Sequence, residues 1–180
     1  MNRDKNLKKE IVEWIVDLAI AVILAGAVLF FFKPIIIQQN SMEPNFHSGD
    51  YVVTSRQAYR MFGEPERGDV IVFKSELLDE KGKNKSLIKR IIGLPGDNVS
   101  IKDGYIYVNG ELVEEDYVAE QGISGEMEEI TVPENSLFCC GDNRGVSLDS
   151  RSEEVGFVTY DTVIGKVFVR LFPFNKIERF

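Results

Sequence analysis

The strongest constraint on this chain is a single apolar run near its start. Residues 18–32 include 15 consecutive positions without a polar side chain, and residues 14–32 make 19 with Asp17 as the only charge. A helix of 19 residues spans about 28 Å, enough to cross a bilayer. A cleaved leader would need small residues at its end, and Phe30-Phe31-Phe32-Lys33-Pro34 has none. Three consecutive Phe also argue against a buried core helix. The sequence therefore predicts a transmembrane anchor over residues 14–33.

Basic residues predict the orientation of this anchor. Arg3, Lys5, Lys8 and Lys9 precede the apolar run, whereas Lys33 alone follows it closely. Positive charge is retained on the cytoplasmic side of a membrane. We therefore expect residues 1–13 to be cytoplasmic and residues 34–180 to be extracytoplasmic, on a single-pass protein of the cell membrane that contacts lipid. Pro34, which has no amide donor, is expected to end or kink the helix.

After the anchor, the pattern changes from helical to strand-like. Turn signals such as Pro95-Gly96-Asp97 separate short β-branched and aromatic runs, and 77–85 reads as a polar loop. The Asn109-Gly110 pair between two such runs is typical of a type I′ hairpin. The runs are 51–53, 70–73, 88–92, 105–108, 157–158 and 163–171. The prediction is one all-β domain over 34–180, preceded by one transmembrane helix. The aromatic 171–174 segment is expected to pack at a sheet edge rather than on lipid.

The net charge of −8 is concentrated in one region. Residues 111–129 contain eight acids and no Lys or Arg, and the remaining acids and bases are equal at 21 each. We interpret this region as the solvated surface of a smaller acidic insert at about 102–133. No basic field exists for nucleic acid.

Cysteine and histidine are too few for a metal or disulfide framework. Cys139 and Cys140 are adjacent and are the chain's two cysteines, so a bridge between them would be strained. With one histidine in addition, they do not form a zinc ligand set. We expect both cysteines to be buried strand residues, and we expect no cofactor.

Ser41, seven residues beyond Pro34, is the candidate nucleophile. A hydrolytic serine needs a base. The single histidine, His47, lies in a turn and is expected to be solvated, and no pair of carboxylates stands out from the acidic region. A lysine base remains, and Lys74, Lys89 and Lys166 all lie in or beside apolar strands. The residues alone do not choose among the three.

A lysine base has to be neutral. At a pKa near 10.4, about one lysine in 2,500 is neutral at pH 7, and half-neutrality costs about 4–5 kcal/mol. Burial among apolar side chains can supply that shift. Strand alternation places Lys89 on one face with Leu87 and Ile91, and Arg90 on the other. The Ser86-x-x-Lys89 spacing of penicillin-binding enzymes is coincidental here, because its flanks are strand-like.

Four motifs follow the anchor in order, and together they resemble the type I signal peptidases, in the compact single-span bacterial form. The motifs are NSMEP (40–44), RGDVIVF (67–73), IKRIIGLPGD (88–97) and GDNR (141–144), followed by Ser147, Asp149 and Arg151.

The resemblance implies a Ser–Lys dyad protease with a signal-peptidase-like β fold, which removes signal peptides from exported preproteins. Ser41 would be the nucleophile and Lys89 the general base, with Ser147 hydrogen-bonded to the lysine. The oxyanion would be held by the Ser41 amide and by the side chain at Gln39. Asp142, Asp149 and Arg151 match positions that support the site by a salt bridge and loop packing. Shallow pockets for small residues at −1 and −3 of the substrate would be lined by Ile37, Met42, Phe46, Leu87 and Ile88.

Two other functions compete with this hypothesis. A non-catalytic anchored β-domain could bind peptides or surface proteins, and it would tolerate loss of Ser41 and Lys89. A self-cleaving Ser–Lys protease of the repressor type would carry a DNA-binding segment before the serine, where this chain has its apolar run.

Overall fold

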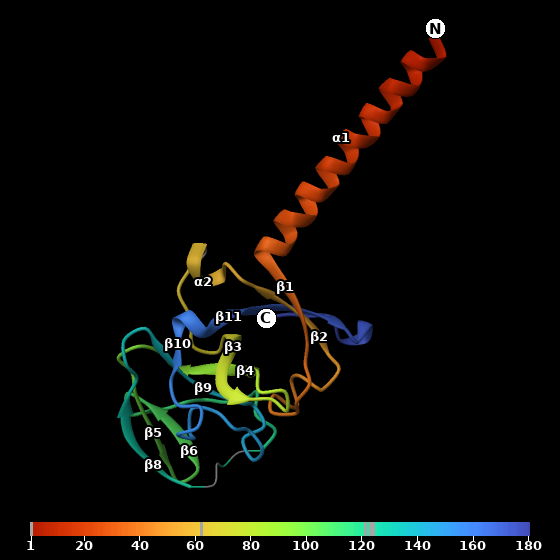
Figure 1. Ribbon diagram of the computed structural model, residues 1–180. Helices are drawn as coiled ribbons and strands as arrows, with labels where there is room; N and C mark the ends of the chain where they lie inside the picture. Colours follow the sequence, from red (N-terminus) through yellow and green to blue (C-terminus); the bar gives the residue numbers. More distant parts are fainter. Residues whose placement is uncertain (1, 62, 121, 123–124) are drawn as a thin grey trace.

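The computed structural model describes residues 2–61, 63–120, 122 and 125–180. Helix α1 (Asn2–Phe31) leads directly into strand β1 (Phe32–Ile36) and projects away from the sheets (Figure 1). Its Lys9–Phe31 segment has a hydropathy of 2.5 and is unburied, so it is long and apolar enough to cross a membrane. The helix ends two residues before the expected boundary at 33. Pro34 lies instead in β1, at the edge of a sheet, where a missing amide donor is tolerated.

The domain that follows α1 is built mainly from strands, as the all-β prediction required. Eight described strands form an antiparallel sheet in the order β1-β2-β11-β3-β4-β9-β10, with β12 paired to β11. Neighbouring strands in this sheet often lie far apart in sequence; β11, for example, lies between β2 and β3. The strands after β1 are β2 (Tyr51–Ser55), β3 (Val70–Leu78), β4 (Asn84–Gly93), β9 (Ser136–Cys140), β10 (Val158–Thr159), β11 (Val163–Phe172) and β12 (Glu178–Arg179).

A second, smaller sheet is inserted between β4 and β9, which are themselves neighbours in the large sheet. Its order is β7-β6-β5-β8. The type I′ hairpin prediction is confirmed, because Asn109 and Gly110 both have positive φ, 54° and 80°. The strands are β5 (Asn98–Lys102), β6 (Tyr105–Val108), β7 (Glu111–Leu112) and β8 (Met127–Thr131). The small sheet thus starts at Asn98, slightly before the expected insert at about 102–133.

The structure differs from the sequence-based expectations in one loop and in several short helical turns. The 77–85 loop is shorter than expected, because β3 continues to Leu78 and β4 begins at Asn84. Side-chain bonds stabilise this polar extension: Ser75 Oγ donates to Lys85 O at 3.0 Å, and Asn84 Nδ2 donates to Ser75 O at 2.8 Å. A one-turn helix, α2 (Ala58–Met61), and two 3₁₀ turns, η1 (Tyr160–Thr162) and η2 (Phe174–Lys176), also went unpredicted. Their apolar residues are too few to give a helical period.

Among the described residues, the core consists of three clusters of buried side chains, one of which joins the two sheets. That cluster combines Ile92 of β4 and Phe138 of β9 with Val99 and Ile106 of the small sheet. The expectation for the cysteines is confirmed. Cys139 and Cys140 are buried in β9 with free thiols, and burial raises the pKa of both.

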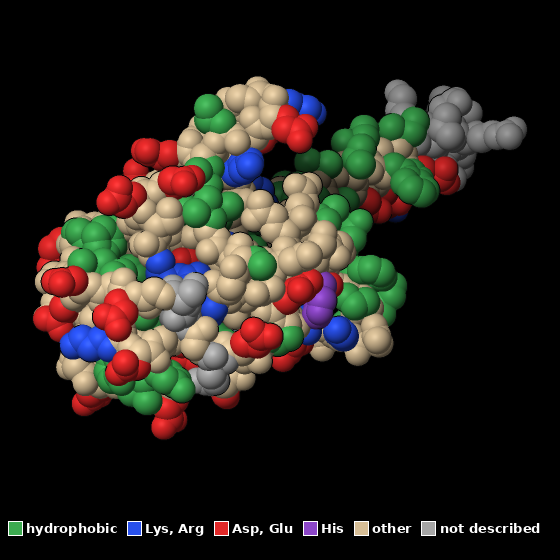
Figure 2. All heavy atoms as spheres, turned by 90° about the horizontal axis from the view of Figure 1, so that it is seen from below, with side chains coloured by type: hydrophobic (Ala, Val, Ile, Leu, Met, Phe, Trp, Pro, Cys, Tyr) green, Lys and Arg blue, Asp and Glu red, His purple; other side chains and the backbone are tan. Residues whose placement is uncertain are grey.

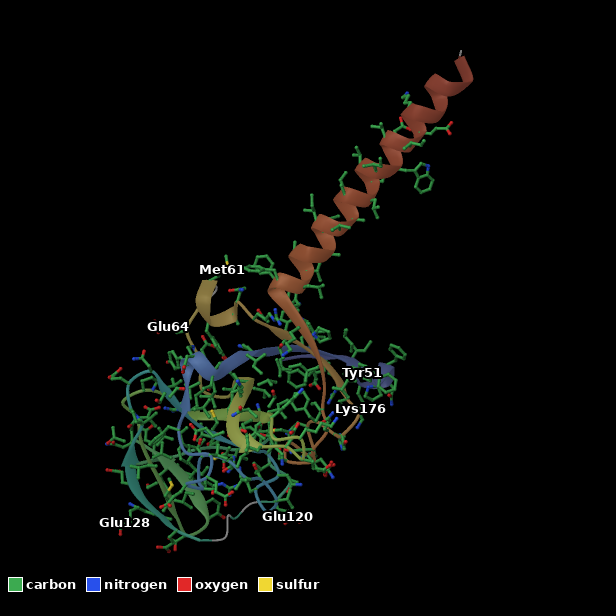
Figure 3. All side chains as sticks on the ribbon, viewed as in Figure 1. Tyr51, Met61, Glu64, Glu120, Glu128 and Lys176 are labelled. Carbon is green, nitrogen blue, oxygen red and sulfur yellow. The ribbon has the colours of Figure 1, made fainter. Side chains whose placement is uncertain are left out.

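The acidic side chains of the insert mostly face solvent. In Figure 3, Glu128 lies at the outer side of the small sheet and Glu120 at the lower edge of the domain, under the loops beside that sheet, and both are exposed. Acidic side chains are also scattered over much of the face seen in Figure 2. Glu115 differs from these acids, because only 9% of its side chain is exposed.

The aromatic C-terminal segment forms an exposed cluster at the end of β11. Phe172 packs edge-on against Tyr51 and Phe174, with ring centroids 5.7 and 5.4 Å apart. Phe174 nevertheless remains 78% exposed. The segment therefore packs at the sheet edge while leaving much of its apolar surface uncovered.

Gly93, at the end of β4, is a tight point between the two sheets. A Cβ added there would lie 2.8 Å from Val99 Cγ2 and 3.1 Å from Val132 Cγ2. We predict that Gly93→Ala lowers the free energy of unfolding by about 1–3 kcal/mol through overpacking. Gly145→Ala is the matched control, since nothing lies within 4 Å of a Cβ there. Urea unfolding of both variants in detergent would test this, and equal stabilities would contradict it.

Candidate active site

Ser41 is held in a tight turn after β1 by backbone bonds and by its apolar neighbours. The Asn143 amide donates to Ser41 O at 3.0 Å, and the Phe46 amide donates to Met42 O at 2.9 Å. The side chains of Met42 and Phe46 are wholly buried in the core. Ser41 itself is 6% exposed. The turn is thus held by the packing of Met42 and Phe46 in the core and by the backbone hydrogen bond from Asn143.

Lys89 lies in the middle of β4 and points into the domain. It is 1% exposed, and its strand neighbours Leu87 and Ile91 are also buried. Its Nζ donates a hydrogen bond to Ser41 Oγ at 2.6 Å. The alternation expected for this strand is confirmed, because the next side chain, Arg90, points elsewhere and binds Asp142.

Burial also determines the proton affinity of Lys89. Desolvation lowers the pKa of this amine to about 8, although the nearby negative charge of Asp149 acts in the opposite direction. At pH 7, a pKa of about 8 leaves about one lysine in ten neutral, compared with about one in 2,500 for a solvated lysine. The site therefore holds an amine that can accept a proton at physiological pH.

The rival bases lie in other surroundings. Lys74 is exposed on β3, and Lys166 forms a salt bridge to Asp69 at 2.6 Å. His47 is partly buried and lines a separate cavity of about 440 Å³. Among these candidate bases, Lys89 is the one with a hydrogen bond to Ser41 in the described residues.

The loop from Gly141 to Arg151, named here the wall loop, lies against the Ser41 turn, since its Asn143 amide binds Ser41 O. Asp149 accepts a bond from the Gly141 amide at 2.9 Å and pairs with Arg151 at 2.7 Å. Burial tends to raise the pKa of Asp149, but the hydrogen bonds and charge of Arg151 outweigh it and keep that pKa below its usual value. Arg151 also donates to Arg144 O at 2.9 Å. These contacts fit the salt bridge and loop packing expected for this segment.

Asp142 forms a second buried pair, with Arg90. Both carboxylate oxygens accept bonds from Arg90, at 2.8 and 2.6 Å, and Asp142 is 1% exposed. Because Arg90 adjoins Lys89, this pair ties the lysine strand to the wall loop.

Ser147 does not make the bond that the resemblance implied. Its Oγ is buried, and no hydrogen bond from it to Lys89 is found in the described part of the chain; it lies near Asp149, whose pKa it helps to lower. The hydroxyl lies against Gly141 instead, where an added Cβ would be 2.2 Å from Ser147 Oγ and 2.4 Å from Ser41 O. The resemblance identified the position of this serine beside the site, but it could not fix the direction of its hydroxyl.

Two cavities adjoin Ser41 and share several lining residues. One, of about 620 Å³, includes Ser41, and the other, of about 370 Å³, lies between residues 35–39 and 84–88. Gln39 and Leu87 line both cavities, and Ile37 and Ile88 line the second. Gln39 is exposed at their rim.

Met42 and Phe46 differ from the other predicted pocket residues. Both are 0% exposed, and neither is among the described lining residues of the two cavities. Phe46 is covered by Phe180, with ring centroids 4.5 Å apart, and by the guanidinium of Arg170. The buried apolar side chains of Met42 and Phe46 anchor the Ser41 turn in the core.

Several residues that shape the site were given no role by the sequence. They are Asn45, Arg90, Glu115, Tyr117, Gly141, Asn143 and Arg144. Arg90, Gly141, Asn143 and Arg144 lay inside the recognised motifs, so the motif signal was available for them. Glu115 and Tyr117 lie in the acidic insert, where no pattern distinguished them from their solvated neighbours.

A serine hydroxyl bonded to a buried amine beside a cavity is suited to nucleophilic hydrolysis. Comparisons with known proteins indicate the family of the chain. Residues 11–172 match the family described as Signal peptidase, peptidase S26. Signal peptidase I of Bacillus licheniformis is 35% identical over 98% of this chain and 97% of its own length. Signal peptidase IB of Staphylococcus aureus (strain COL) is 34% identical, with 96% and 95% covered. A solved signal peptidase I from Enterococcus faecalis is 34% identical over 57% of this chain and 96% of its own, with a TM-score of 0.47.

The chain belongs to the signal peptidase family, peptidase S26. It is therefore a serine endopeptidase of the kind that removes signal peptides from preproteins.

The buried lysine should make stability depend on pH. The pKa of Lys89 is lowered to about 8 from 10.5, so the unfolded chain binds an extra proton between these values. Stability should therefore rise as pH increases through this window. The shifted pKa of Lys89 lowers the free energy of unfolding by about 3 kcal/mol at neutral pH and by less than about 1 kcal/mol at pH 10.

We predict that Lys89→Met, which removes this penalty, unfolds at higher urea concentration than the wild type at pH 7. The lost bond to Ser41 offsets about 1 kcal/mol of the gain. Between pH 7 and pH 10, the free energy of unfolding of the wild type should rise by about 2 kcal/mol relative to that of Lys89→Met. Urea unfolding at both pH values tests this, and a pH-independent difference would show that Lys89 is charged or solvated.

Proposed function

We propose that Ser41 is the nucleophile and Lys89 the general base of a Ser–Lys dyad. One observation carries the proposal: a lysine that is 1% exposed lies with its Nζ 2.6 Å from Ser41 Oγ. That distance is within the reach required for direct proton transfer. The lowered pKa of Lys89 supplies the neutral amine that such a transfer needs.

The proton transfers involve these two side chains and water. Neutral Lys89 takes the proton of Ser41 as its Oγ forms a bond to the scissile carbonyl carbon. When the C–N bond breaks, the Lys89 ammonium returns that proton to the leaving amine, and an ester to Ser41 remains. Lys89 then takes a proton from water, whose oxygen displaces the Ser41 oxygen, and the proton passes to that departing oxygen. Ser41 and neutral Lys89 are thereby restored.

The negative oxygen of each tetrahedral intermediate requires donors. The Ser41 amide is one candidate, and the side-chain amide of Gln39 is the second. Gln39 lies at the shared rim of the two cavities, which supports this role. Being exposed, its side chain can turn toward the carbonyl once substrate covers the rim.

The substrate is proposed to bind as an added strand. Residues 35–39 form one side of the smaller cavity and residues 84–88 the other. β1 is an edge strand, and the β4–β9 pairing begins only at Arg90 in the described residues. Backbone groups on both sides are thus open to an extended peptide. Ile37, Leu87 and Ile88 would narrow the pockets to small side chains at −1 and −3.

The anchor would place this chemistry at the outer membrane surface. With residues 1–13 cytoplasmic, as the basic residues predict, the domain over 34–180 lies outside. Ser41 follows the end of α1 by ten residues. A preprotein held by its own apolar segment shares this surface, which raises the effective concentration of its cleavage site.

We predict that Ser41→Ala and Lys89→Ala each reduce preprotein cleavage by about 1,000-fold or more while the fold is kept. Lys74→Ala, which changes an exposed lysine, is the control and should cleave normally. In the wild type, kcat/KM should rise with pH through about 8, because the base must be neutral. Detergent-solubilised protein, a preprotein and mass spectrometry of the cut site would measure this. Cleavage retained in either dyad variant would remove its assigned role.

A further inference from the structure

The acidic insert sends one segment back to the catalytic sheet. Residues 113–118, named here the strap, follow β7. Within the strap, Val113, Glu115 and Tyr117 are partly buried, whereas Glu114 and Asp116 between them are exposed. The strap is fastened to the small sheet, because the Val113 amide donates to Ile106 O at 3.0 Å. Val113 and Tyr117 also pack against the cluster that joins the two sheets.

Glu115 of the strap holds the wall loop behind Ser41. Its carboxylate binds both terminal nitrogens of Arg144, at 2.7 and 2.5 Å, and little of either side chain is exposed. Arg144 Nε donates to Gly141 O at 2.9 Å. Arg144 directly follows Asn143, whose amide bonds Ser41 O. The Glu115 carboxylate is therefore linked to the Ser41 backbone through one short loop.

Tyr117 of the strap reaches the lysine side of the site. Its ring lies under the guanidinium of Arg90, with Arg90 Cζ 4.2 Å from the ring centroid, and Arg90 adjoins Lys89. Tyr117 O accepts a bond from Asn45 Nδ2 at 2.6 Å, and Asn45 is in the turn that carries Ser41. The Tyr117 hydroxyl donates to Glu115 Oε1 at 2.8 Å, which joins the two anchor points.

We propose that the strap is a positioning element for the dyad, with Glu115 and Tyr117 as its positioning residues. The proposal rests on the proposed function of Ser41 and Lys89. Three segments meet at the strap: the Ser41 turn, the Lys89 strand and the wall loop. The strap thereby fixes the relative position of two side chains that come from distant parts of the chain. Displacement of about 1 Å at a reacting centre can cost about 100-fold in rate.

The contacts of the strap also predict which kinetic constant depends on it. Of its described residues, none lines the two cavities proposed for the substrate. Loosening the strap should therefore affect the chemical step and leave substrate binding nearly unchanged. A purely solvated acidic surface would affect neither step. The near-complete burial of the Glu115–Arg144 pair argues against that plainer role.

The test compares Glu115→Gln with Glu114→Gln in the full-length protein, assayed in detergent with one preprotein. Both changes remove one negative charge from adjacent positions, but Glu114 is exposed. We expect Glu115→Gln to lower kcat about 10-fold to 100-fold with KM changed less than about 2-fold. Glu114→Gln should match the wild type. Thermal unfolding of each variant sets the assay temperature below its midpoint.

A second pair of variants tests the other anchor point without a change of charge. Tyr117→Leu should lower kcat as Glu115→Gln does, whereas Tyr117→Phe, which keeps the ring over Arg90, should retain more activity. Tyr105→Leu, at a 42% exposed position on β6, is the control. In the impaired variants, water has better access to Lys89, so its pKa should rise. The pH at half-maximal kcat should then move above the wild-type value near 8.

The outcomes separate this inference from the proposed function. Loss of kcat at constant KM, with a pH profile moved upward, supports the strap as a positioning element. Wild-type kcat and pH profile in Glu115→Gln and Tyr117→Leu would overturn it, as would a change confined to the unfolding temperature. If Lys89→Ala still cleaves the preprotein, the proposed function itself fails, whatever the strap variants do.

Discussion

The contact between Lys89 and Ser41 depends on removing an amine from water, and much of the domain serves that end. Solvation would keep the lysine charged, and a charged amine cannot accept the serine proton. Lys89 is buried by its place in the middle of β4, with β3 on one side and β9 along part of the other. The desolvation that lowers its pKa to about 8 is a cost to stability of about 3 kcal/mol at neutral pH. A marginally stable domain tolerates such a cost only where the surrounding sheet is well packed.

The serine side of the contact is built by a different means. Ser41 lies in a turn rather than a strand, so its position depends on what surrounds that turn. Met42 and Phe46 anchor it to the core, and the Asn143 amide holds its carbonyl. Within the described residues, the wall loop is in turn fixed by buried ion pairs, among them Asp142–Arg90 and Asp149–Arg151. Buried pairs of this kind add little net stability, but they restrict the geometry that the surrounding loop can adopt.

How far the sequence could predict this arrangement depends on how local each feature is. The anchor, the Asn109-Gly110 hairpin and the inward direction of Lys89 follow from composition, turn chemistry and strand alternation, all readable within a few residues. The choice of Lys89 over Lys74 and Lys166 needed the ordered motifs, because each lysine has apolar strand neighbours. The order of strands in the large sheet could not be read from the sequence, since β11 inserts between β2 and β3 although it begins 85 positions after the end of β3 (163 − 78). The surroundings of the Ser147 hydroxyl and the full burial of Met42 and Phe46 depend on such long-range packing, which no pattern within a few residues indicates.

The acidic insert shows the same limit most clearly. Read locally, its eight acids are equivalent, and a solvated surface is the simplest interpretation of all of them. Seven keep that interpretation, since they are exposed in the structure. Glu115 departs from it because Arg144, 29 positions away, supplies a buried cation at that one point. A carboxylate with 9% of its side chain exposed needs such a partner, and this requirement selects where the insert can touch the catalytic sheet. Acidic residues therefore supply both the surface charge of the insert and its attachment to the site. An acid attaches the insert only where the fold places a buried cation opposite it, as Arg144 is placed opposite Glu115.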